Sequence, residues 1–329
     1  MTRPDQRVPS GATPTSGVRP EAFGRLELAV RRKLEGRLHG DFLGLLPGHG
    51  SEPGEARHYR PGDDVRRIDW AVTARTDQPH VRDTIADHEL TTIGVIDLSG
   101  SLDFGTGRRL KRDVALEVLG AMGFVTAHGA NRFGAMALHP AGERWFAPAS
   151  GRHHVHATLR RIGRLPRSNA ANPGPDGGSA TIDLARGLSR AGRLARRRGL
   201  VVVVSDFLGP PTWAKPLRAI ADRHEVLAVD VVDPRELSLP KVGYLTVADP
   251  ETGRRRVVDT SDTRLRLRYA QAAKAQRTAI AGEIRRAGAD HLTVRTDTDW
   301  LADLVRHVEV RRRSRVTRSG SRMTRSGGR

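Results

Sequence analysis

The sequence predicts an α/β protein: a mainly parallel β-sheet with helices on both faces, preceded by an N-terminal helix and a small β extension. Two apolar runs carry this prediction, TTIGVID ending at Asp97 and LVVVVS ending at Ser205. Neither run alternates polar with apolar residues, which is typical of parallel strands that are buried on both faces. Helical patterns lie between the strand-like runs, and such alternation favours a parallel sheet covered by helices.

The N-terminal part is expected to be an accessory region. Residues 1–20 are rich in Pro, Gly, Ser and Thr and are expected to be disordered. From residue 21 to about residue 37, apolar residues recur at helical spacing, which predicts an amphipathic helix. Residues 57–90 contain short strand-like pieces among turn residues. Residues 21–90 are therefore expected to form the N-terminal helix and the β extension.

Residues 91–313 are expected to form one α/β domain. Residues 242–259 predict a polar hairpin inserted into that domain, because the DPETG segment supplies turn residues. The other elements are expected in this order: strand 92–97, helix 111–129, strands 132–138 and 144–147, helix 181–198, strands 200–205 and 225–233, helix 261–287, strand 291–296 and helix 300–313.

Positive charge is concentrated at the C-terminus. The formal net charge of the 329 residues is +19, and residues 311–329 contain eight Arg and no acidic residue. That segment has too few apolar residues to bury a core, so residues 314–329 are expected to be a disordered, Arg-rich tail. A basic tail can bind nucleic acid through non-specific electrostatics, which is one alternative function.

Composition also limits the chemistry and the location of the protein. The absence of cysteine excludes disulfides, thiolate metal sites and a cysteine nucleophile. No apolar run reaches the roughly 20 residues that a membrane-spanning helix needs, and the N-terminus lacks the apolar core of a signal peptide. We therefore expect a cytoplasmic protein.

Polar residues follow two of the predicted strands at the point where each strand ends. Asp97, Ser99 and Ser101 occupy alternate positions after the first strand, and Asp206 follows the second. Because the carboxyl ends of parallel strands meet at one edge of a sheet, these oxygens are expected to converge. Carboxylate and hydroxyl oxygens suit Mg²⁺, with Ca²⁺ and Mn²⁺ as alternatives.

This spacing resembles the metal-ion-dependent adhesion site of von Willebrand factor A-type domains, which have a Rossmann-like fold. The four oxygen-bearing residues above match the pattern of that site directly. The threonine of the pattern, which follows a Gly-rich turn, is matched in position by Ser179 and in residue type by Thr181, and both stay candidates. The resemblance implies a bound metal ion that accepts a carboxylate from a partner protein.

A second resemblance covers roughly residues 24–313. The run YRPGDDVRRIDW, followed by TAR and by the strand with DLSGS, is similar to the bacterial family called domain of unknown function 58. The resemblance implies association with MoxR-type AAA+ ATPases, and the chain resembles the soluble branch of the family. The residues that carry this signature are Tyr59, Pro61, Gly62, Asp63, Arg66, Asp69, Trp70 and Arg75.

The signature segment allows two interpretations. Its dense charges favour an ion-pair network that ties the β extension to the main sheet, with Trp70 as a buried anchor. A direct partner-binding patch is the alternative.

Three functions are compatible with the sequence. The favoured one is a non-enzymatic interaction module, a partner or adaptor of a MoxR-type ATPase in protein maturation or complex assembly. The partner or client is expected to present an exposed Asp or Glu to the ion, and Arg108, Arg109 and Phe207, in loops that flank the metal edge, are expected to contact it beside the ion. A metal-dependent hydrolase is an alternative because a hard cation activates water, although the pattern supplies no separate general base. Nucleic-acid binding through the tail is the third.

Overall fold

A six-stranded sheet forms the centre of the computed structural model, which describes residues 20–35, 56–59, 68–76, 78–82, 90–126, 131–167, 182–248, 255–307 and 310. The strand order is β10-β7-β6-β3-β4-β5, and among these strands only β5 runs antiparallel to its neighbour. The strands are β3 (Thr91–Asp97), β4 (Arg132–Leu138), β5 (Arg144–Ser150), β6 (Leu200–Ser205), β7 (Glu225–Val232) and β10 (Asp290–Arg295).

The two apolar runs lie next to each other in the middle of this sheet. All residues of β3 and β6 are buried, because helices cover both faces and leave no position for a polar side chain. The two strands pair in parallel, from Thr92 opposite Leu200 to Ile96 opposite Val204. The predicted adjacency of the two strands is therefore confirmed, and both strands end at the same edge.

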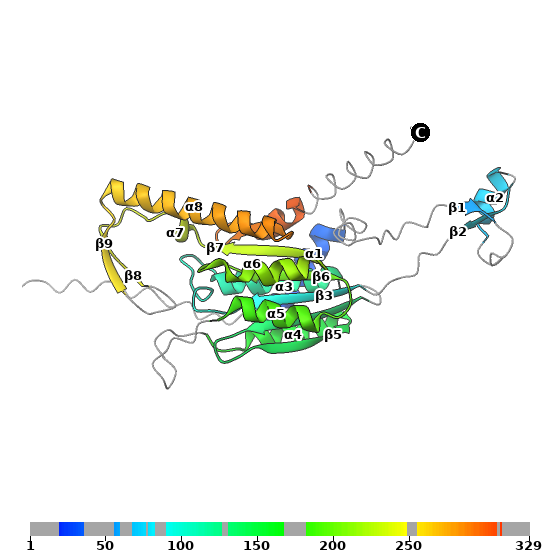
Figure 1. Cartoon of the computed structure of the whole chain (residues 1–329), viewed down its shortest axis with the longest axis horizontal. Coiled ribbons are helices and arrows are strands. Elements are labelled where there is room, and N and C mark those ends of the chain that lie inside the picture. Colours follow the sequence, from blue (N-terminus) through cyan, green and yellow to red (C-terminus); the bar gives the residue numbers. More distant parts are fainter. Residues whose placement is uncertain are drawn as a thin grey trace, which may run out of the picture.

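Helices cover both faces of the sheet, as Figure 1 shows. One apolar cluster joins the first face to α1 (Pro20–Glu35), α3 (Lys111–Thr126), α4 (Arg152–Gly163) and the helical residues 300–307. A second cluster joins the other face to α5 (Leu184–Leu194), the 3₁₀ turn η3 (Pro211–Trp213), α6 (Ala214–Ala221) and α8 (Thr263–Arg286). The predicted fold class, a mainly parallel sheet between two helical layers, is confirmed.

The strand order places a switch point between β3 and β6. After β3 the chain builds β4 and β5 on one side, and it then crosses to build β6, β7 and β10 on the other. In open α/β sheets, ligands bind outside the carboxyl ends of the strands at such a point, because the loops diverge there and leave a crevice. Asp97 ends one of the two strands and Asp206 follows the other.

A small lobe precedes the main sheet. It consists of the antiparallel strands β1 (Ala56–His58) and β2 (His80–Arg82) with α2 (Trp70–Thr76). Trp70 is 71% exposed, so the expectation of a buried anchor is wrong. The physical reason is that α2 contacts β2 through other residues: the hydroxyl of Thr73 accepts the backbone N–H of His80, and the hydroxyl of Thr76 lies 3.1 Å from its Nδ1.

A helix and a hairpin extend beyond the carboxyl edge of the sheet. The short α7 (Pro234–Leu237) follows β7, and β8 (Tyr244–Ala248) then pairs with β9 (Arg255–Asp259) in an antiparallel hairpin. In α8 the first buried residue is Ala273, because the preceding turns project past the sheet. We call this hairpin together with residues 263–276 the arm (Figure 1). In the described part of the chain, no helix is both long and apolar enough to cross a membrane.

Candidate metal and partner-binding site

Asp97 lies at the centre of the carboxyl edge. Its Oδ1 accepts the backbone N–H of Ser99 at 2.9 Å, and its Oδ2 accepts the hydroxyl of Ser205 at 2.7 Å. Burial, together with the negative charge of Asp206, raises the pKa of Asp97 to about 6, against the lowering effect of these hydrogen bonds. The carboxylate is thus firmly oriented and lies in surroundings that are short of positive charge.

The two serines of the DLSGS segment point to one place. Ser99 and Ser101 are both buried, and their hydroxyl oxygens lie 3.0 Å apart. The hydroxyl of Ser101 also hydrogen-bonds the side chain of Asp206. The structure therefore brings together the four site residues predicted from the two strands: two carboxylates from neighbouring strand ends and two hydroxyls from the loop that follows β3.

Asp206 has a cationic partner that the sequence analysis missed. Lys111, the first residue of α3, is fully buried, and its Nζ lies 2.7 Å from Asp206 Oδ2 and 2.5 Å from Glu236 Oε1. Burial alone would raise the pKa of Asp206, but the ammonium of Lys111, together with the hydrogen bonds from Ser101 and the N–H of Leu208, outweighs burial and holds that pKa below its ordinary value. Likewise, the two carboxylates keep the pKa of Lys111 above its ordinary value despite burial.

Arg277 of α8 extends this network to the neighbouring strand. Its Nη1 donates to Asp230 Oδ1 at 2.8 Å and to the backbone carbonyl of Asp206 at 2.9 Å, and its Nη2 donates to Glu236 Oε2 at 3.0 Å. Among the described residues, the four carboxylates Asp97, Asp206, Asp230 and Glu236 lie at this edge with the cations Lys111 and Arg277, and the imidazole of His291 lies 3.9 Å from Asp230.

Asp233 fixes the loop that carries Arg108 and Arg109. Its carboxylate accepts the N–H and the hydroxyl of Thr106, at 3.0 and 2.6 Å, and the hydroxyl of Thr296 at 2.8 Å. Burial raises the pKa of Asp233, but these hydrogen bonds dominate and lower it. Arg108 and Arg109 are exposed on this loop, and Arg109 forms a 3.2 Å ion pair with Glu117.

Phe207 does not lie on the surface. It is only 1% exposed, and its ring packs against Trp213 with 5.0 Å between centroids. It adopts a φ of 51°, which is uncommon for a bulky residue, while its N–H donates to the hydroxyl of Ser205. The expected contact between Phe207 and a partner therefore does not fit the structure, because the strained turn after β6 directs the ring into the core.

Several predicted site residues lie outside the described residues: Ser179, Thr181, Pro61, Gly62, Asp63 and Arg66. Of the other signature residues, Asp69 accepts the N–H of Val72 at 3.3 Å near the start of α2, and the N–H of Tyr59 donates to the carbonyl of Pro79. Arg75 is exposed near the end of the same helix. In the structure these residues build the small lobe.

Sequence reasoning missed Lys111, Ser205, Glu236 and Arg277 as members of the site. One signal for Lys111 was available: only five of the 56 basic residues are lysines, and this one stands at the start of a largely buried helix. For Arg277 no such signal exists, because it is one of many arginines on a long helix.

Comparison with known families and proteins agrees with the signature. The family described as "Protein of unknown function DUF58" matches residues 55–279. Uncharacterized proteins of Mycobacterium tuberculosis and Mycobacterium bovis are 51% identical over 292 residues, which is 89% of this chain and 89% of theirs. An uncharacterized protein of Mycobacterium avium is 48% identical over 164 residues, 50% of this chain and 92% of that protein.

Solved structures with similar folds are more distant. The conserved hypothetical protein BatB from Bacteroides thetaiotaomicron aligns with a TM-score of 0.41 and 14% identity over 67% of this chain and 97% of its own. The SpRpn10 VWA domain aligns with a TM-score of 0.37 and 14% identity over 66% of this chain and 94% of its own. By its family match and its mycobacterial relatives, the chain belongs to the DUF58 family of proteins of unknown function.

Proposed function

We propose that this protein is a non-enzymatic protein-interaction module that binds its partner at the carboxyl edge of β3 and β6, with Mg²⁺ as part of the contact surface. The observation that carries the proposal is the convergence of Asp97, Ser99 and Ser101 at the switch point of the sheet, with the two hydroxyl oxygens 3.0 Å apart. Oxygen groups gathered at such a position are what a ligand-binding edge requires.

The residues present fit a magnesium ion. The two serine hydroxyls hydrogen-bond each other at 3.0 Å. Two ligands at right angles around Mg²⁺, each about 2.0–2.1 Å from it, lie about 2.9 Å apart, so an ion would replace this hydrogen bond with little movement of the two oxygens. The excess of carboxylates over cations at the edge favours a divalent ion. The described residues contain no group of three or more His, Cys, Asp or Glu side chains placed to hold a metal ion, so the serine hydroxyls are essential to this proposal.

Asp97, Ser99 and Ser101 would hold the ion, while Asp206 would support it through the hydroxyl of Ser101. When bound, the ion supplies a positive charge that attracts a carboxylate of the partner. The proposal includes no catalytic step, because it commits Asp97 to the ion, while Asp206 and Glu236 share the ammonium of Lys111. A general base needs a carboxylate that is available to take a proton.

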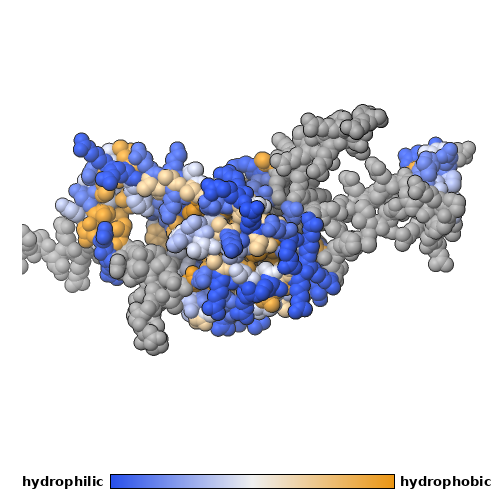
Figure 2. Space-filling view, in the orientation of Figure 1, coloured by the Kyte–Doolittle hydropathy of each residue, from blue (hydrophilic) through white to orange (hydrophobic). Residues whose placement is uncertain are grey.

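The arm provides further contact surface beside the edge. Tyr244, Val257 and Leu267 of the arm, and Val242 just before it, are 58–80% exposed, and Figure 2 shows apolar surface over the hairpin. A two-stranded hairpin is marginally stable alone, which favours completion by a partner. Exposed arginines accompany these apolar side chains on the arm, so an acidic protein surface is the complementary partner: Arg255, Arg256, Arg264 and Arg268. The family resemblance makes a MoxR-type AAA+ ATPase our proposed partner.

The test is capture of a purified MoxR-type AAA+ ATPase from the same organism, measured by interferometry with and without a chelator. Replacing Asp97→Asn is expected to weaken binding by about tenfold or more, because the central oxygen ligand loses its charge. Asp222→Asn, at an exposed carboxylate that ends α6, is the matched control and is expected to leave binding unchanged.

Chelation is expected to weaken the wild-type complex as much as Asp97→Asn does, and to add nothing to that variant. Deleting residues 311–329 is expected to alter the salt dependence but not the chelator effect. The proposal would be contradicted if neither the chelator nor Asp97→Asn weakens binding of the ATPase, while deletion of residues 311–329 abolishes it.

A further inference from the structure

We infer that Lys111 is a built-in counter-ion that competes with the divalent cation for Asp206, and so sets how weakly this edge binds metal. The inference rests on the proposed metal site. It is carried by the placement of the ammonium: a fully buried Nζ lies between Asp206 and Glu236 at 2.7 and 2.5 Å. The 2.7 Å distance to Asp206 is that of a charge-assisted hydrogen bond, and Glu236 is in equally direct contact, so Lys111 pairs with both carboxylates.

A divalent ion bound directly by Asp206 would lie about 2 Å from a carboxylate that already holds the ammonium. Two cations on one buried carboxylate repel each other strongly, because little water is present to screen them. The ammonium cannot retreat into solvent without opening the start of α3, since Lys111 is its first residue and its N–H donates to the carbonyl of Phe104.

Lys111 therefore keeps Asp206 out of the inner coordination shell. Among the described residues, the ion is left with Asp97 as its charged ligand, together with the hydroxyls of Ser99 and Ser101. A shell with one charged ligand binds Mg²⁺ weakly and leaves the ion more positive. Such an ion gains more from the carboxylate of a partner, so Lys111 makes metal binding and partner binding depend on each other.

The first experiment is calorimetric titration with Mg²⁺ of the wild type and of Lys111→Met, which keeps the length of the side chain and removes its charge. The variant is expected to bind Mg²⁺ roughly tenfold more tightly or better, because Asp206 becomes available. Lys215→Met, at an exposed lysine on α6, is the matched control and is expected to bind like the wild type.

Equal affinity in Lys111→Met and wild type would overturn this inference and leave the metal site standing. Absence of Mg²⁺ binding in both proteins at 10 mM would overturn the metal proposal and this inference together. The variant loses a buried ion pair and can therefore be less stable, so a second measurement uses the wild type. Nuclear magnetic resonance after lysine-specific isotope labelling gives few signals, because the chain has five lysines. Mg²⁺ is expected to shift the side-chain signal of Lys111 and to leave the signals of the other four lysines unchanged. If Mg²⁺ binds and the Lys111 signal does not shift, the inference is also overturned.

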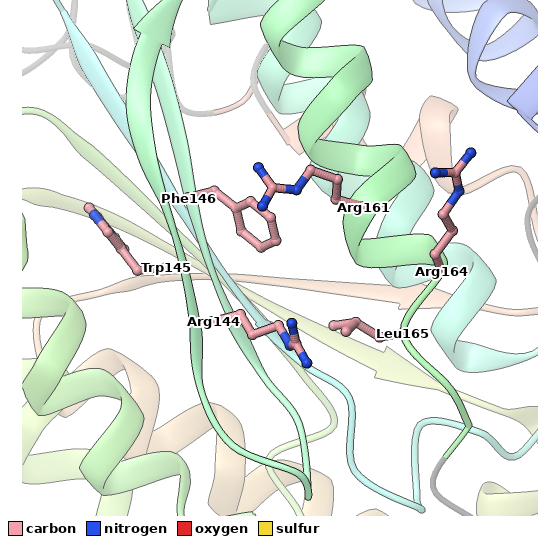
Figure 3. Close-up of a pocket in the computed structure, with 6 residues that line it drawn as sticks. All are labelled: Arg144, Trp145, Phe146, Arg161, Arg164 and Leu165. Carbon is pink, nitrogen blue, oxygen red and sulfur yellow. The ribbon is translucent and has the colours of Figure 1, made fainter.

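A separate observation supports a second proposal: a hollow of about 460 Å³ beside the edge strand β5 is lined by arginines (Figure 3). Arg144 comes from β5, while Arg161 and Arg164 come from the end of α4. The guanidinium of Arg161 lies over the ring of Phe146, 5.1 Å from its centroid, and Figure 3 shows Arg144 reaching toward Leu165. The hollow thus has an apolar floor and a cationic rim.

The charges of this rim are not neutralised within the described residues, where Arg144, Arg161 and Arg164 have no carboxylate partner. The wall behind them is firmly held. Arg112, itself 5% exposed, donates to the carbonyls of Leu165 and Pro166 at 2.5 and 3.0 Å. We propose that this hollow binds a phosphoryl group carried by a small molecule of mononucleotide size, because guanidinium groups pair with phosphate oxygens in a bidentate manner and the volume suits such a ligand.

Nuclear magnetic resonance titration with inorganic phosphate, AMP, adenosine and glutamate tests this proposal and separates free phosphate from a nucleotide. AMP is expected to shift the backbone amide signals of residues 144–146 and 161–165. Adenosine and glutamate are expected to leave these signals unchanged. Arg161→Gln is expected to weaken AMP binding about fivefold or more, as each charge-assisted pair contributes substantially. Arg218→Gln, on the exposed side of α6, is the control.

Tighter binding of AMP than of phosphate would assign a nucleotide, and equal binding would assign the phosphoryl group alone. Shifts with glutamate as large as those with AMP would show a general anion surface and overturn the proposal. The double variant Arg144→Gln/Arg161→Gln is the last test. If it binds AMP as tightly as the wild type does, the proposal is overturned as well.

Discussion

Replacing Arg277→Met is expected to lower the free energy of unfolding by roughly 3–5 kcal/mol. The guanidinium pairs with Asp230, which is 1% exposed, and with Glu236, and it also donates to the carbonyl of Asp206. Methionine fills much of the same volume but leaves a buried carboxylate without its cation. Urea denaturation followed by circular dichroism measures the change.

Arg285→Met is the matched control for this prediction, because that arginine is exposed near the end of the same helix. We expect a change within about 0.5 kcal/mol for the control, as for most surface substitutions. A loss for Arg277→Met no greater than that of the control would show that the network at the edge contributes little to stability. In that case the arm would not be fixed to the sheet through Arg277.

Gly199→Ala is expected to destabilise the protein by about 3 kcal/mol or more, at the upper end of overpacking costs. A Cβ added at Gly199 would lie 2.0 Å from the carbonyl oxygen of Thr91. That oxygen belongs to the backbone of β3, so it can move only if β3 and β6 separate.

Gly107→Ala controls for the substitution itself, since nothing lies within 4 Å of a Cβ added there. Thermal unfolding of both variants compares them directly, and the control is expected to melt like the wild type. Wild-type stability of Gly199→Ala would mean that the two central strands are not packed as closely as the structure shows.

Much of the fold could be predicted from short stretches of sequence. A strand that is buried on both faces must be apolar at every position, so TTIGVID and LVVVVS identify the centre of the sheet without further information. Parallel strands also end at a common edge, so the meeting of Asp97 and Asp206 followed from the strand assignment. The ends of helices are harder to predict. The sequence predicts a helix over residues 181–198, whereas in the structure this helix spans Leu184–Leu194 and the side chain of Asp183 caps its start.

Which groups neutralise the site was decided by the tertiary structure. Lys111 lies 95 residues from Asp206 and 125 from Glu236 in the chain, so no local pattern links them. The same holds for two large apolar side chains. Trp70 was expected to be a buried anchor but is 71% exposed, and Phe207 was expected to contact a partner at the surface but is 1% exposed. Periodicity determines which side of an element is apolar, because that depends on neighbouring residues alone. Which charge meets which, and which ring is covered, depends on how separate elements pack, and that is decided only when the whole chain is folded.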